Sequence, residues 1–249
     1  MDEWFGSATS NENGSASVTT RPIFLPDPGG QLVNEVEMEF QWHPGFAMVQ
    51  QQKNVESLHC SAAAKGFQPL LEISTRSRDN LGIRLSAFNL TLRTPAANEP
   101  VTVEAAFQSS KVYSESGQQQ HLLTMKDGRR IKAEVRELAG ESIDSFRFEE
   151  REWGLTPRTS FYDYLYLRAL CDTMREDDSL LKRFANFVGF TDIAFNPKRS
   201  FNCQARSCAL FIGLGGIEKV DLLLANPDSL IAVFIERQYG CEPPNDRLF

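Results

Sequence analysis

The sequence predicts an α+β fold that is mainly helical, with its strands in the N-terminal third. Three observations support this prediction. Most segments with a readable period are helical, residues 36–40 alternate apolar and charged side chains, and no segment holds the roughly 18–20 consecutive apolar residues of a membrane helix. The 249 residues, 41% of them hydrophobic, suffice for one domain with a large core.

The N-terminal part of the chain contains the expected β element. Residues 7–20 are almost all small or polar, which predicts a flexible leader over residues 1–20. The proline-rich segment that follows should be extended, because residues before proline avoid the helical region. A strand at 32–40, a helix at 53–65 and a buried strand at 69–75 complete a β-containing extension, residues 21–75, that we expect to pack on the core.

The rest of the domain, placed at residues 21–238 before a tail at 239–249, is predicted to be helical. Residues 114–120 are a polar interruption, and residues 122–150 show no readable period. Helices are expected at residues 101–113, 159–174, 178–188, 202–214 and 228–238.

Charge and cysteine content limit the class of function. A net charge of −7 argues against non-specific binding to nucleic acid, which depends on many Lys and Arg contacts to phosphate, but leaves a specific nucleic-acid substrate open. Five cysteines without a Cys-x-x-Cys pair are typical of reduced thiols, and residues 1–4 lack the features of a secretory signal, so a cytoplasmic protein is expected. His43, His59 and His121 lack metal-ligand spacing, and we expect no metal and no cofactor.

The helix expected at residues 101–113 would carry the first candidate site. Seven residues make almost two helical turns, so Glu104 and Lys111 should project from one face, with Gln108 between them. A carboxylate and an ammonium on an otherwise apolar helix are costly to bury unless they are used. The alternative is a solvated face with a weak ion pair.

The second candidate site is the helix start at Asn202. If Asn202 caps this helix, the free backbone N–H groups and the helix dipole form a seat for a phosphate or diphosphate, to which Lys198, Arg199 and Arg206 could lend charge. An ordinary capped helix beside solvated basic residues is the commoner alternative.

A third candidate is Asp192, which lies in an apolar loop at residues 189–193. Apolar surroundings raise the pKa of a carboxyl group and suit it to general acid catalysis. Equally, Asp192 could simply cap a turn.

Several blocks of sequence resemble the NADAR family, also called YbiA-like. They are LSAFN at 85–89, VEAAFQSSK at 103–111, FTD at 190–192 and NCQAR at 202–206. Three further blocks, KNVESLH at 53–59, LLEIST at 70–75 and FYDYLY at 161–166, are similar to the DarT-associated NADAR antitoxins. The resemblance covers about residues 21–238 and implies a NADAR-type core. The chain departs from the usual pattern at Ala87, where the core family often has Asn, and at Ile193, where Trp-Gly often follows the aspartate.

The resemblance implies an N-glycosidase that removes ADP-ribose from guanine in nucleic acid and so acts as the antitoxin to a DarT-type ADP-ribosyltransferase. The implied partners are ADP-ribosylated guanine in DNA, with single-stranded DNA as one form, or ADP-ribose, and the cognate toxin as a functional partner; no membrane partner is expected. By position, the implied catalytic residues are Glu104, Lys111 and Asp192. The implied substrate-binding residues are Ser86, Asn89, Phe107, Gln108, Asn202, Gln204, Ala205 and Arg206.

A mechanism follows as a hypothesis. Cleavage of a ribose–guanine bond passes through an oxocarbenium-like transition state. Lys111, if partly desolvated and neutral, would attack the anomeric carbon and form a Schiff base, while Glu104 moves protons and Asp192 positions the ribose or protonates the leaving group. Two other functions stay open: an N-glycosidase of riboflavin-pathway intermediates, and a non-catalytic module that binds ADP-ribose or sequesters a toxin.

Overall fold

A four-stranded sheet with the strand order β2-β1-β10-β3 forms one end of the protein, whose computed structural model describes residues 17–198 and 200–239. β1 and β2 are a long antiparallel hairpin, and β10 joins this hairpin to β3 by pairing antiparallel with β1 and parallel with β3. The strands are β1 (Ser17–Asp27), β2 (Leu32–Trp42), β3 (Leu70–Glu72) and β10 (Gly189–Thr191).

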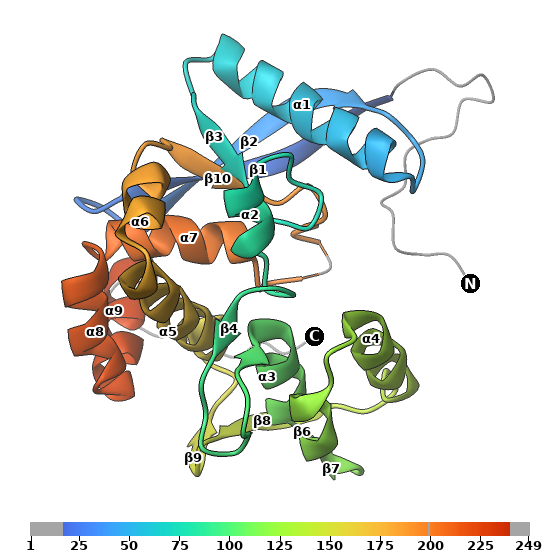
Figure 1. Ribbon diagram of the computed structural model, residues 1–249, viewed down its shortest axis with the longest axis vertical. Coiled ribbons are helices and arrows are strands. Elements are labelled where there is room, and N and C mark those ends of the chain that lie inside the picture. The colour runs from blue at the N-terminus through green and yellow to red at the C-terminus, as the bar shows by residue number, and fades with distance from the viewer. Residues whose placement is uncertain (1–16, 199, 240–249) are drawn as a thin grey trace.

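Helices α1 (Met48–Ala64) and α7 (Gln204–Gly213) cover opposite faces of this sheet (Figure 1). Side chains alternate along a strand, so Ile23 packs under α1 while its neighbour Phe24 belongs to the main core. A Cβ atom on Gly213 would lie 2.0 Å from the carbonyl oxygen of Leu32, so only glycine allows α7 to approach β2 this closely.

Helix α5 (Ser160–Glu176) runs through the main core and contacts α3, α7, α8 and α9. A second sheet, in the order β7-β6-β8-β9, packs on α5 through Phe146, Phe148 and Trp153, which meet the ring of Phe161. Its strands are β6 (Lys111–Tyr113), β7 (Gly117–Gln118), β8 (Ile143–Phe148) and β9 (Arg151–Trp153), and a separate pair is formed by β4 (Thr91–Leu92) and β5 (Val101–Thr102). The remaining helices are α2 (Asn80–Arg84), α3 (Val103–Ser110), the 3-10 helix η1 (Gln120–Thr124), α4 (Gly128–Glu137), α6 (Asp178–Phe184), α8 (Ile217–Leu224) and α9 (Pro227–Tyr239).

The α+β class with more helix than strand is confirmed, and several element boundaries predicted from the sequence are wrong. The flexible leader was expected to reach Thr20, but Ser17–Thr20 belong to β1. The backbone N–H and C=O groups of these residues are satisfied by pairing with β2, which holds the segment in the sheet although its side chains are mostly polar. The helix expected at 101–113 is shorter at both ends, since the Thr102 side chain caps it by accepting a hydrogen bond from Ala105 N at 3.1 Å and residues 111–113 form β6. Residues 1–16 of the leader and 240–249 of the tail lie outside the described residues.

The N-terminal extension, residues 21–75, shares its sheet with β10, which comes from the C-terminal half of the core sequence. Among the helices that the structure describes, none combines the length and apolarity required to cross a bilayer.

Candidate active site

The first group of polar side chains lies on α3 and just beyond its end. Glu104 stands in the first turn, and its backbone N–H donates to the Ala87 carbonyl at 2.9 Å. The Gln108 amide donates to Glu104 Oε1 at 3.2 Å. Lys111 is not on the helix as the sequence suggested, because its φ of −63° and ψ of 131° are extended and it begins β6.

The Lys111 amine nevertheless stays close to α3. Its Nζ lies 5.1 Å from the centre of the Phe107 ring, and the amine interacts electrostatically with Glu104. Burial lowers the pKa of Lys111, and the Glu104 carboxylate opposes this shift with a smaller effect. A larger fraction of this amine is therefore neutral and nucleophilic than of a lysine in water.

Asp192 is held at the end of β10 by two hydrogen bonds. Gln204 donates to its Oδ2 at 2.9 Å, and the backbone N–H of Ala194 donates to Oδ1 at 3.0 Å. Burial raises the pKa of Asp192, and these hydrogen bonds oppose the rise. Asp192 therefore caps a turn, and it is also a carboxyl group with a raised pKa, while its role as a general acid stays a prediction.

Two features bring Asp192 and α3 into one site. Gln204, which holds Asp192, also accepts a hydrogen bond at 2.8 Å from the N–H of Ala87, whose carbonyl binds the start of α3. Lys132 of α4 interacts electrostatically with both Glu104 and Asp192, while burial lowers its pKa. We call the set Glu104, Gln108, Lys111, Lys132, Asp192 and Gln204 the polar cluster.

A buried hydrogen-bond network lies directly behind Asp192. Glu72, only 2% exposed, accepts hydrogen bonds from Ser74 Oγ at 2.6 Å, Thr191 Oγ1 at 2.7 Å and Ile193 N at 3.0 Å. His59 Nε2 lies 2.8 Å from the same Thr191 hydroxyl. Burial raises the pKa of Glu72 to about 7, with the nearby Asp192 carboxylate adding to the rise, and burial lowers the pKa of His59 to about 4. Between these two pKa values, from about pH 4 to about pH 7, Glu72 and His59 are therefore mostly uncharged, and their hydrogen bonds to Thr191 and Ile193 fix the strand that carries Asp192.

Replacing Glu72 with glutamine should remove part of the pH dependence of stability. Between pH 4.5 and about 7 the folded protein keeps a proton on Glu72 that the unfolded chain has lost, so stability falls as pH rises and levels off above 7. The rise of the Glu72 pKa from 4.5 to about 7 corresponds to a free-energy change of roughly 3 kcal/mol. Urea unfolding at pH 5 and pH 8 should show a larger loss in the wild type than in Glu72→Gln; the exposed change Glu152→Gln on β9 is the control. Parallel pH profiles for all three proteins would contradict the prediction.

The start of α7 differs from the sequence prediction. The N-cap is Cys203, not Asn202, and it makes no side-chain capping hydrogen bond, so the first backbone N–H groups of α7 are left to other partners. Asn202 Oδ1 and Gln108 Oε1 are buried and accept no hydrogen bond from the described part of the protein. Two such acceptors are costly unless a donor reaches them, and the hydroxyls and amino groups of a bound nucleotide are donors of this kind.

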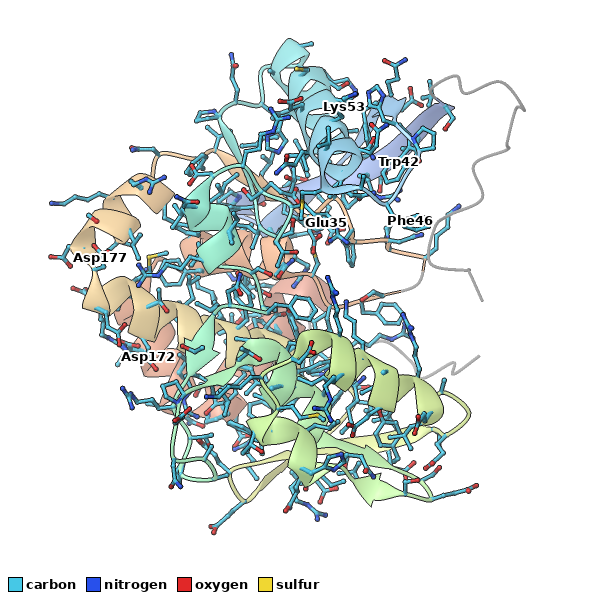
Figure 2. The ribbon with its side chains drawn as sticks, turned by 45° about the vertical axis from the view of Figure 1, so that its right-hand side comes forward. Glu35, Trp42, Phe46, Lys53, Asp172 and Asp177 are labelled. Atoms are coloured by element: carbon cyan, nitrogen blue, oxygen red, sulfur yellow. The ribbon has the colours of Figure 1, made fainter. Side chains whose placement is uncertain are left out.

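The other residues expected in the site lie at its edge or in the core. Arg206 is paired with Asp163 Oδ2 at 3.2 Å and with Glu35 Oε1 at 3.4 Å, so its charge is already balanced (Glu35 is labelled in Figure 2). Asn89 is exposed and donates to the Ile83 carbonyl at 2.8 Å. Ser86, Ala205 and Phe107 are buried, and Phe107 packs among Phe146, Phe161 and Tyr162.

Residues 19–242 match the family model of the DarT1-associated NADAR antitoxin. The chain belongs to this family. A search of curated proteins found no match.

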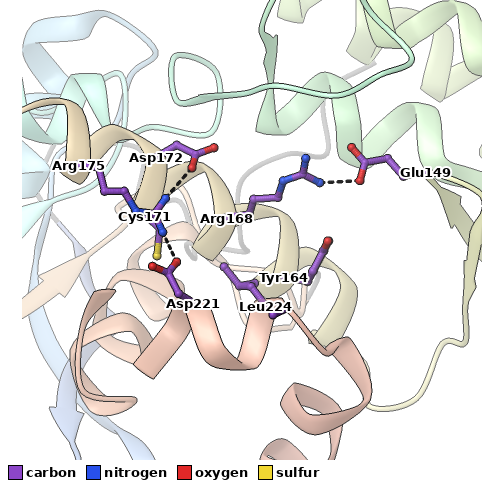
Figure 3. Close-up of a pocket in the computed structure, with 9 residues that line it drawn as sticks. Glu149, Tyr164, Arg168, Cys171, Asp172, Arg175, Asp221 and Leu224 are labelled. Carbon is purple, nitrogen blue, oxygen red and sulfur yellow. Dashed lines mark hydrogen bonds and ion pairs between the residues drawn. The ribbon is translucent and has the colours of Figure 1, made fainter. Parts of the chain in front are cut away.

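This NADAR antitoxin also has a concavity of about 370 Å³ between α5 and α8 (Figure 3), and no residue of the polar cluster lines it. Two arginines line it, and both are paired: Arg168 with Glu149 at 2.7 Å, and Arg175 with Asp172 at 2.9 Å and with Asp221. Since these carboxylates balance its positive charge, the concavity suits an anionic ligand poorly. Among the described residues, no group of three His, Cys, Asp or Glu side chains is arranged to hold a metal ion.

Three charged residues in or beside the polar cluster were not identified from the sequence, namely Glu72, Arg76 and Lys132. Glu72 had a signal, because a carboxylate inside a buried apolar strand is costly and calls for an explanation. Arg76 lowers the pKa of both Asp192 and Lys132. It lies in the loop between β3 and α2, where no periodic pattern or motif distinguished it. Lys132 lies in a segment without a readable period, so nothing in the sequence distinguished it.

Proposed function

We propose that this antitoxin is an N-glycosidase that removes ADP-ribose from guanine in nucleic acid, reversing the modification made by a DarT-type toxin. The observation that carries the proposal is the Lys111 amine, whose pKa is lowered by burial while Glu104 lies within electrostatic reach. An amine that is neutral part of the time can act as a nucleophile, and an adjacent carboxylate can accept its proton. The family membership supports the antitoxin role.

The proposed reaction begins with attack of the Lys111 nitrogen on the anomeric carbon of the ribose. The electron pair of the ribose–guanine bond leaves with guanine, which takes a proton from Asp192, a carboxyl group whose raised pKa suits this role. Glu104 accepts the proton that the new C–N bond forces off Lys111 and returns it to the ring oxygen, whose bond to the anomeric carbon breaks to give a hydroxyl and a protonated Schiff base. Water then adds to this iminium carbon and gives a proton to Asp192, and breaking of the C–N bond releases ADP-ribose and regenerates the lysine.

The surrounding groups suggest how the substrate is held. Gln108 Oε1 and Asn202 Oδ1 are buried acceptors that could bind ribose hydroxyls or the guanine amino group. The first backbone N–H groups of α7, which no side chain caps, suit the diphosphate. On this view Arg206 fixes the position of α7 through Asp163 rather than contacting the phosphates.

A glycosidase assay tests the proposal. The wild-type protein should release ADP-ribose from an oligonucleotide modified on one guanine and restore the unmodified mass. Glu104→Gln should lower the rate by roughly 10²–10⁴-fold, the usual range for loss of acid–base catalysis, whereas the exposed change Glu152→Gln should not.

Two results would reject the proposal. Tight binding of ADP-ribose without any cleavage, together with protection against the toxin that survives Glu104→Gln, would point to a non-catalytic module. Cleavage of free riboflavin-pathway intermediates but not of the modified oligonucleotide would keep the bond type and change the substrate.

A further inference from the structure

Helix α4 concentrates positive charge in an acidic protein. Four of its ten residues are Arg or Lys, although the chain carries a net charge of −7. At about 100° per residue, Arg129, Lys132 and Arg136 fall within roughly 60° of one another on the helix surface. Arg130 falls about 160° from Lys132, on the opposite side. We call the first three residues the α4 stripe.

The middle of the α4 stripe lies at the polar cluster, and its two ends are exposed. Its middle member, Lys132, interacts with Glu104 and Asp192, and Arg136 is near enough to lower the pKa of Lys132. The helix is held there by close packing, because a Cβ atom on Gly128 would lie 2.6 Å from the ring of Phe88, over which the Lys132 amine is placed at 4.6 Å. Figure 1 shows α3 between α5 and α4, and α3 contacts both.

The outer ends of the stripe have no carboxylate partner among the described residues. Arg129 and Arg136 are exposed, and neither forms an ion pair there. By the same geometry Glu134 lies on the opposite side of the helix, where it is paired with His121 at 2.5 Å, and Glu137 lies about 80–140° away from the three stripe residues. The arginines of the α5–α8 concavity, in contrast, are all neutralised by carboxylates.

We propose that the α4 stripe binds the phosphate backbone of the nucleic acid next to the modified guanine. This proposal rests on the proposed function and identifies the surface that holds the polymer. Arg129 and Arg136 are separated by about 10 Å along the helix axis, the rise of seven helical residues. This length matches about three nucleotides of a strand at roughly 3.4 Å each. ADP-ribose alone supplies only one diphosphate, which the start of α7 can hold, so the stripe distinguishes a polymeric substrate from a free one.

The double variant Arg129→Ala/Arg136→Ala tests the stripe, with Arg130→Ala as a matched control on the other side of the same helix. On an oligonucleotide ADP-ribosylated at one guanine, kcat/KM of the double variant should fall by about tenfold or more, and the slope of log(kcat/KM) against log[salt] should become shallower by about 1.4, or 0.7 for each lost phosphate contact. On ADP-ribosylated guanosine the double variant should equal the wild type. Arg130→Ala should match the wild type on both substrates.

Each alternative outcome decides a separate point. Equal losses on the oligonucleotide and the nucleoside, or no loss on either, overturn the stripe while leaving the glycosidase in place. If the wild type cleaves neither substrate, the proposed function is wrong, and fluorescence anisotropy with the unmodified oligonucleotide then decides on the stripe. Weaker and less salt-dependent binding by the double variant supports it, and unchanged binding overturns it.

Discussion

Replacing Lys111 with alanine should lower the rate of guanine release by about 10³-fold or more, because the proposed reaction loses its nucleophile. Arginine should not restore activity, since a guanidinium group stays protonated in proteins and cannot attack carbon. Lys53→Ala, at an exposed position on α1, is the control and should leave the rate unchanged (Lys53 is labelled in Figure 2).

Chemical trapping separates a nucleophilic lysine from one that only binds. Borohydride added during turnover reduces a Schiff base to a stable amine, so intact-mass and peptide analysis should locate one ADP-ribosyl adduct on Lys111. The adduct should be absent from Lys111→Ala. An unmodified Lys111 beside complete cleavage would reject the covalent step and leave direct hydrolysis assisted by Glu104 and Asp192.

The local chemistry of α3 shows what the sequence could predict about the site and what it could not. Glu104, Gln108 and Lys111 were identified from helical spacing and family resemblance, and the structure brings them together. The reason given from spacing was wrong for Lys111, because the helix ends at Ser110. Pairing with β8 makes Lys111 extended, and pairing between distant strands leaves no local pattern.

The fold, like the site, was predicted where the sequence pattern is local and was missed where it depends on contacts between distant segments. Long elements with clear periods, such as α5 and β2, were predicted to within a few residues. The second sheet was missed, because its strands are short and because β6 is separated in the sequence from its partner β8 by η1 and α4. Lys132 was missed because its position depends on a contact between segments distant in sequence: α4 packs on Phe88, and this packing places Lys132 near Asp192.

Replacing Asp163 with alanine should destabilise the protein by about 3–5 kcal/mol, the usual cost of breaking a buried ion pair. Asp163 is 2% exposed and accepts hydrogen bonds from Arg206 at 3.2 Å and from Ser207 Oγ at 2.6 Å. Without it, Arg206, itself 12% exposed, would keep the half-exposed Glu35 as its one charged partner among the residues that the structure describes. Urea unfolding measures the loss, and Asp228→Ala, which removes an exposed partner of Arg151, should cost less than about 1 kcal/mol.

The variant Asp163→Asn tests whether the negative charge of this side chain or its size and hydrogen bonding stabilises the protein. Burial raises the pKa of Asp163 even though Arg206 and Ser207 lower it, so the fold does not fully compensate the ionised carboxylate. Asp163→Asn keeps an oxygen for the Ser207 hydroxyl and should therefore cost clearly less than Asp163→Ala. Equal costs would mean that the charge itself holds Arg206.

The same end of α7 carries Gln204, which positions Asp192. Asp163→Ala should therefore also lower kcat at temperatures where the variant is still folded, while Asp163→Asn should retain most of the wild-type kcat.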